Sequence, residues 1–178
     1  MNANIVLTMS GPDRIGIVEE ITKLLLDLGG NVETSRMTRL GGEFAVLMLV
    51  SLSPEQLAEM DNVVASLTAN GYMTTISRVG HSYAESHPDW ISYQIEVRGA
   101  DHEGIIHQVT QYLSRRGINI ESMDTETSRA PVSGTPLFSM TALVAVPPSV
   151  AAQNWEAALR DVGRDLNVDI KVNEVRGD

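Results

Sequence analysis

Gly11-Pro12-Asp13-Arg14-Ile15-Gly16-Ile17 and Gly99-Ala100-Asp101-His102-Glu103-Gly104-Ile105 are two versions of one heptapeptide, 88 positions apart in a chain of 178 residues. The same shift aligns the residues that follow without a gap. The identical positions are Gly11, Asp13, Gly16, Ile17, Thr22, Leu25, Gly29, Asn31 and Glu33, which match Gly99, Asp101, Gly104, Ile105, Thr110, Leu113, Gly117, Asn119 and Glu121. Such a period indicates that the chain contains one structural unit twice.

Each heptapeptide is predicted to join a strand to a helix. In the first copy, the apolar run Ile5–Met9 favours a strand and the Gly-Pro pair that follows favours a turn. Asp13 has the side chain typical of a helix N-cap, and Asp101 is expected to cap the helix of the second copy in the same way. The first helix is predicted to bury one apolar face and to end at Gly29-Gly30; that face comprises Ile17, Val18, Ile21, Leu24, Leu25 and Leu28.

The rest of the first copy predicts a hairpin, a second helix and a last strand. Gly41-Gly42 favours a hairpin turn between strands at 31–39 and 44–52, and the second of these strands is apolar enough to be central in a sheet. Ser53-Pro54-Glu55-Gln56 is the signature of a helix start. Gly71 is expected to end this helix, and residues 72–79 then read as a strand.

The second copy repeats this order with a longer hairpin. Strands are expected at 93–98, 118–127, 137–146 and 168–175, with a helix after each heptapeptide turn and another after Pro147-Pro148-Ser149. Phe138 aligns with Phe44 at an offset about six residues larger than before, so the segment Arg129–Pro136 is predicted to lengthen the second hairpin.

The order β-α-β-β-α-β predicts an α+β fold with two tandem ferredoxin-like domains. Each is expected to form a four-stranded antiparallel sheet with both helices on one face. The predicted domains are residues 1–80 and 93–178, joined by a linker at 81–92 that has turn-forming residues and no periodicity. Because this topology carries many functions, the function must be argued from the site.

Composition and charge exclude several classes of protein. The net charge is −10 and neither half is basic, so direct binding to nucleic acid is not expected, because that binding depends on lysine and arginine at phosphates. The absence of cysteine excludes thiolate metal sites and a cysteine nucleophile. The longest apolar run, Phe44–Val50, is far shorter than the ~20 residues of a membrane span, and the first residues lack the features of a signal peptide. We therefore expect a cytoplasmic protein.

No catalytic, cofactor or metal site is predicted. The sequence contains no phosphate-binding glycine loop and no candidate nucleophile with a neighbouring base. His102 and His107 are five residues apart, which misses the spacing that places two metal ligands on one helix face. His81 and His87 fall in the predicted linker.

The two helix starts are the candidate ligand sites. Free backbone N–H groups and the positive end of the helix dipole favour an anion there, such as the carboxylate of an amino acid. Asn31 and Asn119 could donate to and accept from the same ligand. The candidate ligand-binding residues are Gly11, Asp13, Arg14, Gly16, Ile17 and Asn31 in the first copy, and Gly99, Asp101, Gly104, Ile105 and Asn119 in the second.

A purely structural role remains open for each of these residue types. Aspartate at a helix start and glycine in a tight turn suit the fold whether or not a ligand binds. Asn31 and Asn119 suit the turn after a helix-ending glycine. Glu33 and Glu121 read more readily as exposed strand positions than as ligand contacts.

The Gly-Pro-Asp-Arg-x-Gly-Ile-Val motif, followed by Gly-x-Asn-Val-Glu, resembles the loop region of ACT domains. The tandem arrangement and the length resemble the glycine cleavage system transcriptional repressor family, whose members pair two ACT domains. The second loop departs from the pattern, because Ala100 and His102 stand where the first loop has proline and arginine. The resemblance implies a small amino-acid effector, a homodimer, and a protein partner such as a transcription activator.

Three functional hypotheses follow. The first is a non-enzymatic regulatory protein that senses a small amino acid of the glycine type and controls a partner in the transcription of amino-acid metabolism genes. The second is a protein-interaction module that keeps the fold but binds no ligand. The third, a regulatory piece of an enzyme, would need a separate catalytic subunit.

Overall fold

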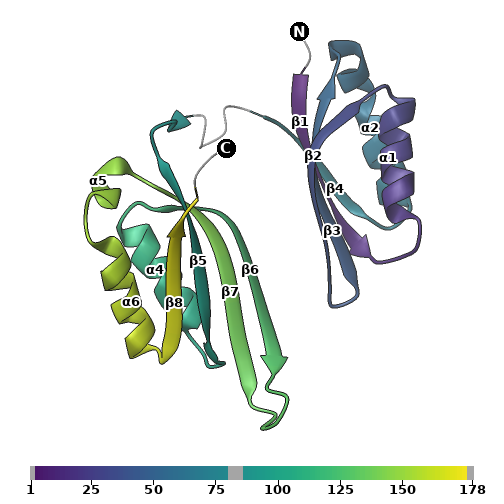
Figure 1. The fold of residues 1–178 in the computed structure, drawn as a ribbon. Coiled ribbons are helices and arrows are strands. Elements are labelled where there is room, and N and C mark those ends of the chain that lie inside the picture. Colours follow the sequence, from purple (N-terminus) through teal and green to yellow (C-terminus); the bar gives the residue numbers. More distant parts are fainter. Residues whose placement is uncertain (1–2, 80–85, 176–178) are drawn as a thin grey trace. The chain divides into compact units, whose positions relative to one another are not determined.

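The computed structural model describes residues 3–79 and 86–175 (Figure 1). The chain divides into two compact units, residues 1–82 and 83–178, each with its own sheet and hydrophobic core. Residues 81–85 of the predicted linker lie outside the described residues. Strand β5 (Ile91–Ala100) begins within the predicted linker, because Ile91 and Ser92 extend the pairing with Val146 and Ala145.

The first unit has the predicted order of elements. Its strands are β1 (Ala3–Pro12), β2 (Asn31–Leu40), β3 (Glu43–Leu52) and β4 (Met73–Arg78), and its helices are α1 (Ile17–Asp27) and α2 (Pro54–Ala69). The strands are antiparallel in the order β2-β3-β1-β4, which makes β3 central as expected. Figure 1 shows both helices on one face of the sheet, so the ferredoxin-like fold is confirmed.

The core of the first unit lies between this face and the helices. Ile5, Leu7 and Met9 of β1 are fully buried and stand opposite Val50, Met48 and Val46 of β3. From α1, the residues Ile17, Ile21 and Leu25 complete the packing. Val18 was predicted to join them, but it is 39% exposed, and the equivalent Ile106 of the second unit is 39% exposed as well. Neither side chain belongs to the hydrophobic core of its unit.

Two turns form as their residue types predict. Gly41 and Gly42 have φ angles of 60° and 88°, and this left-handed pair closes the β2–β3 hairpin. At the start of α2, the Ser53 hydroxyl accepts from the Gln56 amide, and the Gln56 side chain accepts from the Ser53 amide. This reciprocal cap satisfies two N–H groups that the helix itself leaves unpaired.

The second unit repeats the topology. Besides β5, it has the strands β6 (Asn119–Arg129), β7 (Pro136–Val146) and β8 (Val168–Glu174), and the helices α4 (Ile105–Arg115), α5 (Pro148–Ala151) and α6 (Trp155–Asp165). The antiparallel strand order is β6-β7-β5-β8. Its core centres on Ile95, Val97, Val109, Leu113 and Leu159.

The second unit also differs from the first in two places. Residues 130–135 connect β6 and β7, so the hairpin is longer than that of the first unit, as predicted. The single helix predicted after Pro147 is instead the short α5 followed by α6, and residues 152–154 separate them. The new start places Trp155 in the core, where it is 2% exposed and its carbonyl accepts from the buried Tyr112 hydroxyl at 2.5 Å.

Candidate functional site

Both heptapeptides form the loop between the first strand and the first helix of their unit. The Asp13 amide donates to the carbonyl of Gly42 at 3.0 Å, and the Asp101 amide donates to the carbonyl of Pro136 at 3.0 Å. Each loop is thus held to the near end of its hairpin by the same backbone bond. The duplicated sequence therefore produces the same loop path twice.

The predicted aspartate N-caps are wrong. The N-cap residues are Gly16 and Gly104, with φ angles of 90° and 94°, and no side chain caps either helix. The left-handed glycine delays the helix start to the next residue, which leaves each aspartate four positions before the helix. The Asp13 carboxylate instead pairs with Arg39 Nη1 at 3.3 Å.

Arg14 fastens the first loop to the turn before β4. Its Nε donates to the Tyr72 hydroxyl at 2.8 Å, and its guanidinium carbon lies 5.7 Å from the centre of the Tyr72 ring. Arg14 also pairs with Glu20. The bond to Glu20 and, after it, the bond to Tyr72 raise the pKa of the Arg14 guanidinium. Glu20 accepts in turn from Asn70 at 2.7 Å. The predicted ligand contact is therefore occupied by groups of the protein.

His102 holds the same position in the second loop and also reaches across its unit. Its Nε2 lies 2.7 Å from the carbonyl oxygen of Leu166, and its Nδ1 lies 3.0 Å from the carbonyl oxygen of Glu103. These two bonds, with a smaller contribution from the charge of Asp101, raise the pKa of His102.

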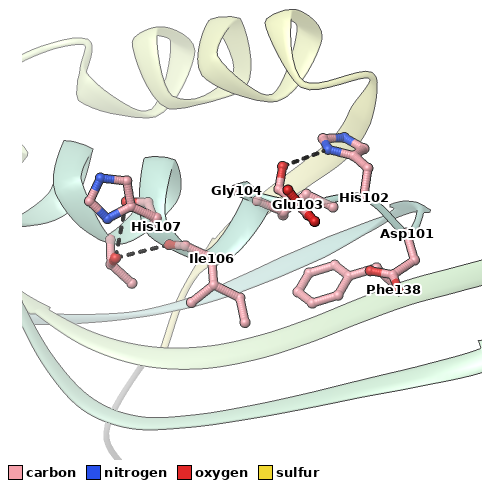
Figure 2. Close-up of a pocket in the computed structure, with 9 residues that line it drawn as sticks. Asp101, His102, Glu103, Gly104, Ile106, His107 and Phe138 are labelled. Atoms are coloured by element: carbon pink, nitrogen blue, oxygen red, sulfur yellow. Dashed lines mark hydrogen bonds between the residues drawn. The ribbon is translucent and has the colours of Figure 1, made fainter.

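A cavity of about 560 Å³ lies beside the second loop, at the start of α4 (Figure 2). It contains three of the predicted ligand residues, Asp101, Gly104 and Ile105. Figure 2 shows the Phe138 ring below the loop and the His102 ring above it, beside the pale yellow ribbon, with His107 at the other end of the view. The other lining residues are Glu103, Ile106, His107 and Thr110.

Gly11 and Gly99 are packing residues of their loops. A Cβ atom on Gly11 would stand 2.6 Å from Tyr72 Cδ1, and one on Gly99 would stand 2.7 Å from Val168 Cγ1. Such distances are well inside van der Waals contact, so each glycine lets its first strand closely approach the chain where its last strand begins. This close approach explains why both copies have glycine there.

Asn31 and Asn119 begin the second strands of their units, and neither lines the cavity beside the second loop. Asn119 lines a separate cavity of about 350 Å³, which shares Thr110 with the first. Asn31 is exposed and stands opposite Ser51. Glu33 and Glu121 are exposed and occupy the register shifts between Val32 and Thr34 and between Ile120 and Ser122.

The first unit has a cavity of about 380 Å³ on the outer face of α1, lined by Glu19, Thr22, Lys23 and Leu26. None of the predicted ligand residues of the first copy lines it. Of the two loops, the second is thus the one whose predicted residues line the described cavities.

Two further findings concern metal binding and membrane crossing. Among residues 3–79 and 86–175, no three side chains of histidine, aspartate or glutamate gather in a way that could hold a metal ion. In the same part of the chain, none of the helices is long and apolar enough to cross a membrane.

Comparison with known proteins identifies the repeated unit. The sequence pattern of the ACT domain matches residues 3–75 and again residues 93–153. The glycine cleavage system transcriptional repressor of Escherichia coli is 27% identical over 172 residues, which span 96% of this chain and 90% of the repressor, and the protein of that name from Shigella flexneri gives the same values.

A solved structure agrees over the whole length. The crystal structure of an unknown protein from Galdieria sulphuraria superposes with a TM-score of 0.85 and 35% identity, covering 99% of this chain and 100% of that one. Two ACT matches, one in each unit, account for the internal repeat. The chain belongs to the ACT-domain family as a tandem ACT protein of the regulatory type, and it resembles the glycine cleavage system transcriptional repressors along nearly its entire length.

Proposed function

We propose that this protein is a non-enzymatic, cytoplasmic sensor of a small amino acid of the glycine type, and that it controls a protein partner in the transcription of amino-acid metabolism genes. The observation that carries the proposal is the cavity beside the second loop. Asp101, Gly104 and Ile105 line it at the start of a helix that no side chain caps.

The chemistry of this cavity suits a zwitterion. The amide groups at the start of α4 and the positive end of its dipole favour the carboxylate of an amino acid. The Asp101 side chain offers an acceptor to the ammonium group. A ligand of about five heavy atoms has a best-case binding free energy near −1.5 kcal/mol per atom, which corresponds to roughly micromolar affinity.

The partner is proposed to be a protein, such as a transcription activator. The net charge of −10 disfavours direct contact with DNA, because phosphate groups attract lysine and arginine and repel carboxylates. Dimerisation is part of the proposal, with effectors bound where ACT domains of neighbouring subunits meet. It is supported by β2, β4, β6 and β8, each of which has a paired neighbour on one side only among the described strands.

Calorimetric titration of the full chain with the twenty amino acids, glycine and serine first, tests the sensing role. We expect saturable heat with one or a few small amino acids at micromolar to millimolar concentration. Absence of heat with all twenty at millimolar concentration would refute amino-acid sensing. Light scattering with and without the bound amino acid tests the dimer in the same samples.

The alternative is a protein-interaction module without a ligand. It is favoured by the bonds of Arg14 to Tyr72 and Glu20, which leave the first loop fastened by the protein's own groups. A partner that co-purifies with the chain equally well in the presence and absence of amino acids would support this alternative over sensing.

A further inference from the structure

The His102 ring contacts two acceptors at the same time. The carbonyl oxygens of Leu166 and Glu103 lie 2.7 Å and 3.0 Å from its two nitrogens, and a carbonyl oxygen can only accept a hydrogen bond. A neutral imidazole has one N–H group, whereas the imidazolium ion has two. Both contacts are therefore hydrogen bonds only when the ring is doubly protonated.

These bonds join two elements that are far apart in the sequence. Glu103 belongs to the loop before α4, while Leu166 is the C-cap of α6 and precedes Asn167, whose φ of 52° places it in the left-handed region. The carbonyl of Leu166 lies at the negative end of the α6 dipole, which favours a cation. The bond at Nε2 thus holds the loop to the turn that leads into β8.

Among the charged groups near this contact, Asp101 favours the protonated ring. The other charged residues next to these contacts in the sequence are Glu103 on the loop and Arg164, Asp165 and Asp169 on either side of Leu166, and Arg164 is paired with Asp161. The two carbonyl bonds are the main causes that raise the pKa of His102, and Asp101 adds a smaller contribution by its charge.

The first unit makes the corresponding connection with a permanent cation. Arg14 precedes His102 by 88 positions and binds Tyr72 in the turn before β4. A guanidinium group stays charged at every pH that the fold withstands, whereas an imidazole loses its charge within the physiological range. The same fastening is thus constant in one unit and titratable in the other.

We propose that His102 is a pH-dependent latch, which fastens the Asp101–Gly104 loop to the turn after α6 while its ring is doubly protonated and releases one of the two attachments when the ring loses a proton. Because Asp101, His102, Glu103 and Gly104 all line the 560 Å³ cavity, the latch couples the shape of that cavity to pH. It operates with or without an effector, so it stands apart from amino-acid sensing.

The direction of the pH effect follows from the raised pKa. Protonation of His102 is more favourable in the folded chain than in the unfolded chain, so it stabilises the fold. The contribution is fully present at pH values below the ordinary pKa of histidine. It is lost as the pH rises through the higher pKa of the folded state.

Nuclear magnetic resonance of the full chain with labelled histidine tests the latch directly. The His102 signal is assigned by its loss in His102→Gln, and it is titrated in the native chain and in urea. We expect both ring nitrogens to carry protons below the transition, and the transition to occur at higher pH in the native chain. A single neutral tautomer at all pH values, or a native transition at or below that in urea, would overturn the proposal.

Hydrogen exchange of residues 101–104, corrected for the intrinsic effect of pH, tests the consequence for the loop. We expect protection to fall as the pH rises through the His102 transition in the wild type and in the control His107→Gln, whose histidine lines the same cavity. His102→Arg, which places the residue type of position 14 in the second loop, should keep a protection that does not vary with pH. A wild-type loop whose protection ignores the His102 transition would also overturn the proposal, and the wild-type titration decides the matter if His102→Arg fails to fold.

Discussion

Arg14 and His102 occupy the same position in the two units and bind different atoms of the equivalent turn. Arg14 Nε donates to the side-chain hydroxyl of Tyr72 at 2.8 Å, whereas His102 Nε2 lies 2.7 Å from the backbone carbonyl oxygen of Leu166. Val168 faces Gly99 as Tyr72 faces Gly11, and valine has no hydroxyl group to offer. The second loop therefore uses the backbone, and its cavity lies beside that contact.

Tyr72→Phe is expected to weaken the first unit by about 1 kcal/mol, since it removes the two hydrogen bonds of the hydroxyl, one of them weak, and leaves the ring in place. The lost bonds are the one from Arg14 Nε and the weaker one from the hydroxyl to the carbonyl of Pro12. Urea unfolding followed by circular dichroism measures the change. The control is Ser77→Ala at an exposed position of β4, and equal stability of the two variants would show that the Arg14 bond contributes nothing.

Gly16→Ala is expected to cost about 1–2 kcal/mol through the backbone alone. No atom lies within 4 Å of the added Cβ, so the destabilisation comes from the left-handed φ of 90° and not from a steric clash. Gly16→Asn should cost less, because asparagine tolerates this region better than alanine. Thermal unfolding of the two variants checks the order, and a more stable Gly16→Ala would contradict the backbone explanation.

Gly163→Ala is expected to destabilise the second unit by about 1–3 kcal/mol, because it overpacks the contact between α6 and β8. The new Cβ would stand 2.7 Å from Ile170 Cγ1 and 2.9 Å from the carbonyl oxygen of Val168. Fluorescence of the buried Trp155 reports the unfolding of this unit. Ser114→Ala, on the exposed side of α4, is the control, and a Gly163→Ala variant as stable as this control would show that α6 can shift without loss.

Asp101→Asn is expected to weaken amino-acid binding about tenfold or more, since it removes a charged acceptor for the ammonium group. Asp13→Asn should have the smaller effect, because the Asp13 carboxylate already pairs with Arg39. Calorimetry on both variants measures the difference. Equal loss in the two variants would mean that both loops bind, and unchanged affinity in Asp101→Asn would exclude its carboxylate as a ligand contact.

Much of the fold could be predicted because its signals are local. The order of strands and helices follows from short apolar periods, and the Gly41-Gly42 turn and the Ser53 cap follow from residues that act on their nearest neighbours. The internal repeat strengthened the prediction, because the same order of strands and helices had to fit the sequence of both copies. The topology then followed from the rules of chain connection.

The local signals failed where a neighbouring residue changed the backbone. Asp13 reads as an N-cap, but the left-handed Gly16 sets the helix start and turns the aspartate toward Arg39. Val18 fits the helical period, yet it is 39% exposed and outside the core. The helical period and the residue types of a helix do not reveal which of its apolar side chains the rest of the unit will cover.

The candidate site depends on contacts between residues that are far apart in the sequence, and the spacing of residues along the chain does not reveal such contacts. Arg14 and Tyr72 are 58 residues apart, and His102 and Leu166 are 64 apart. Sequence reasoning singled out Arg14 as a ligand contact and missed Tyr72 altogether. The alignment of Arg14 with His102 was the one available signal, since both are basic residues at the same position of the repeat.

Because both units belong to one polypeptide, every molecule contains one copy of each. A substitution that alters the fastening of one loop therefore leaves the other loop of the same molecule unchanged. With arginine at position 14 and histidine at position 102, one chain holds its first loop with a cation that stays charged, while the latch proposed for the second loop follows the pH.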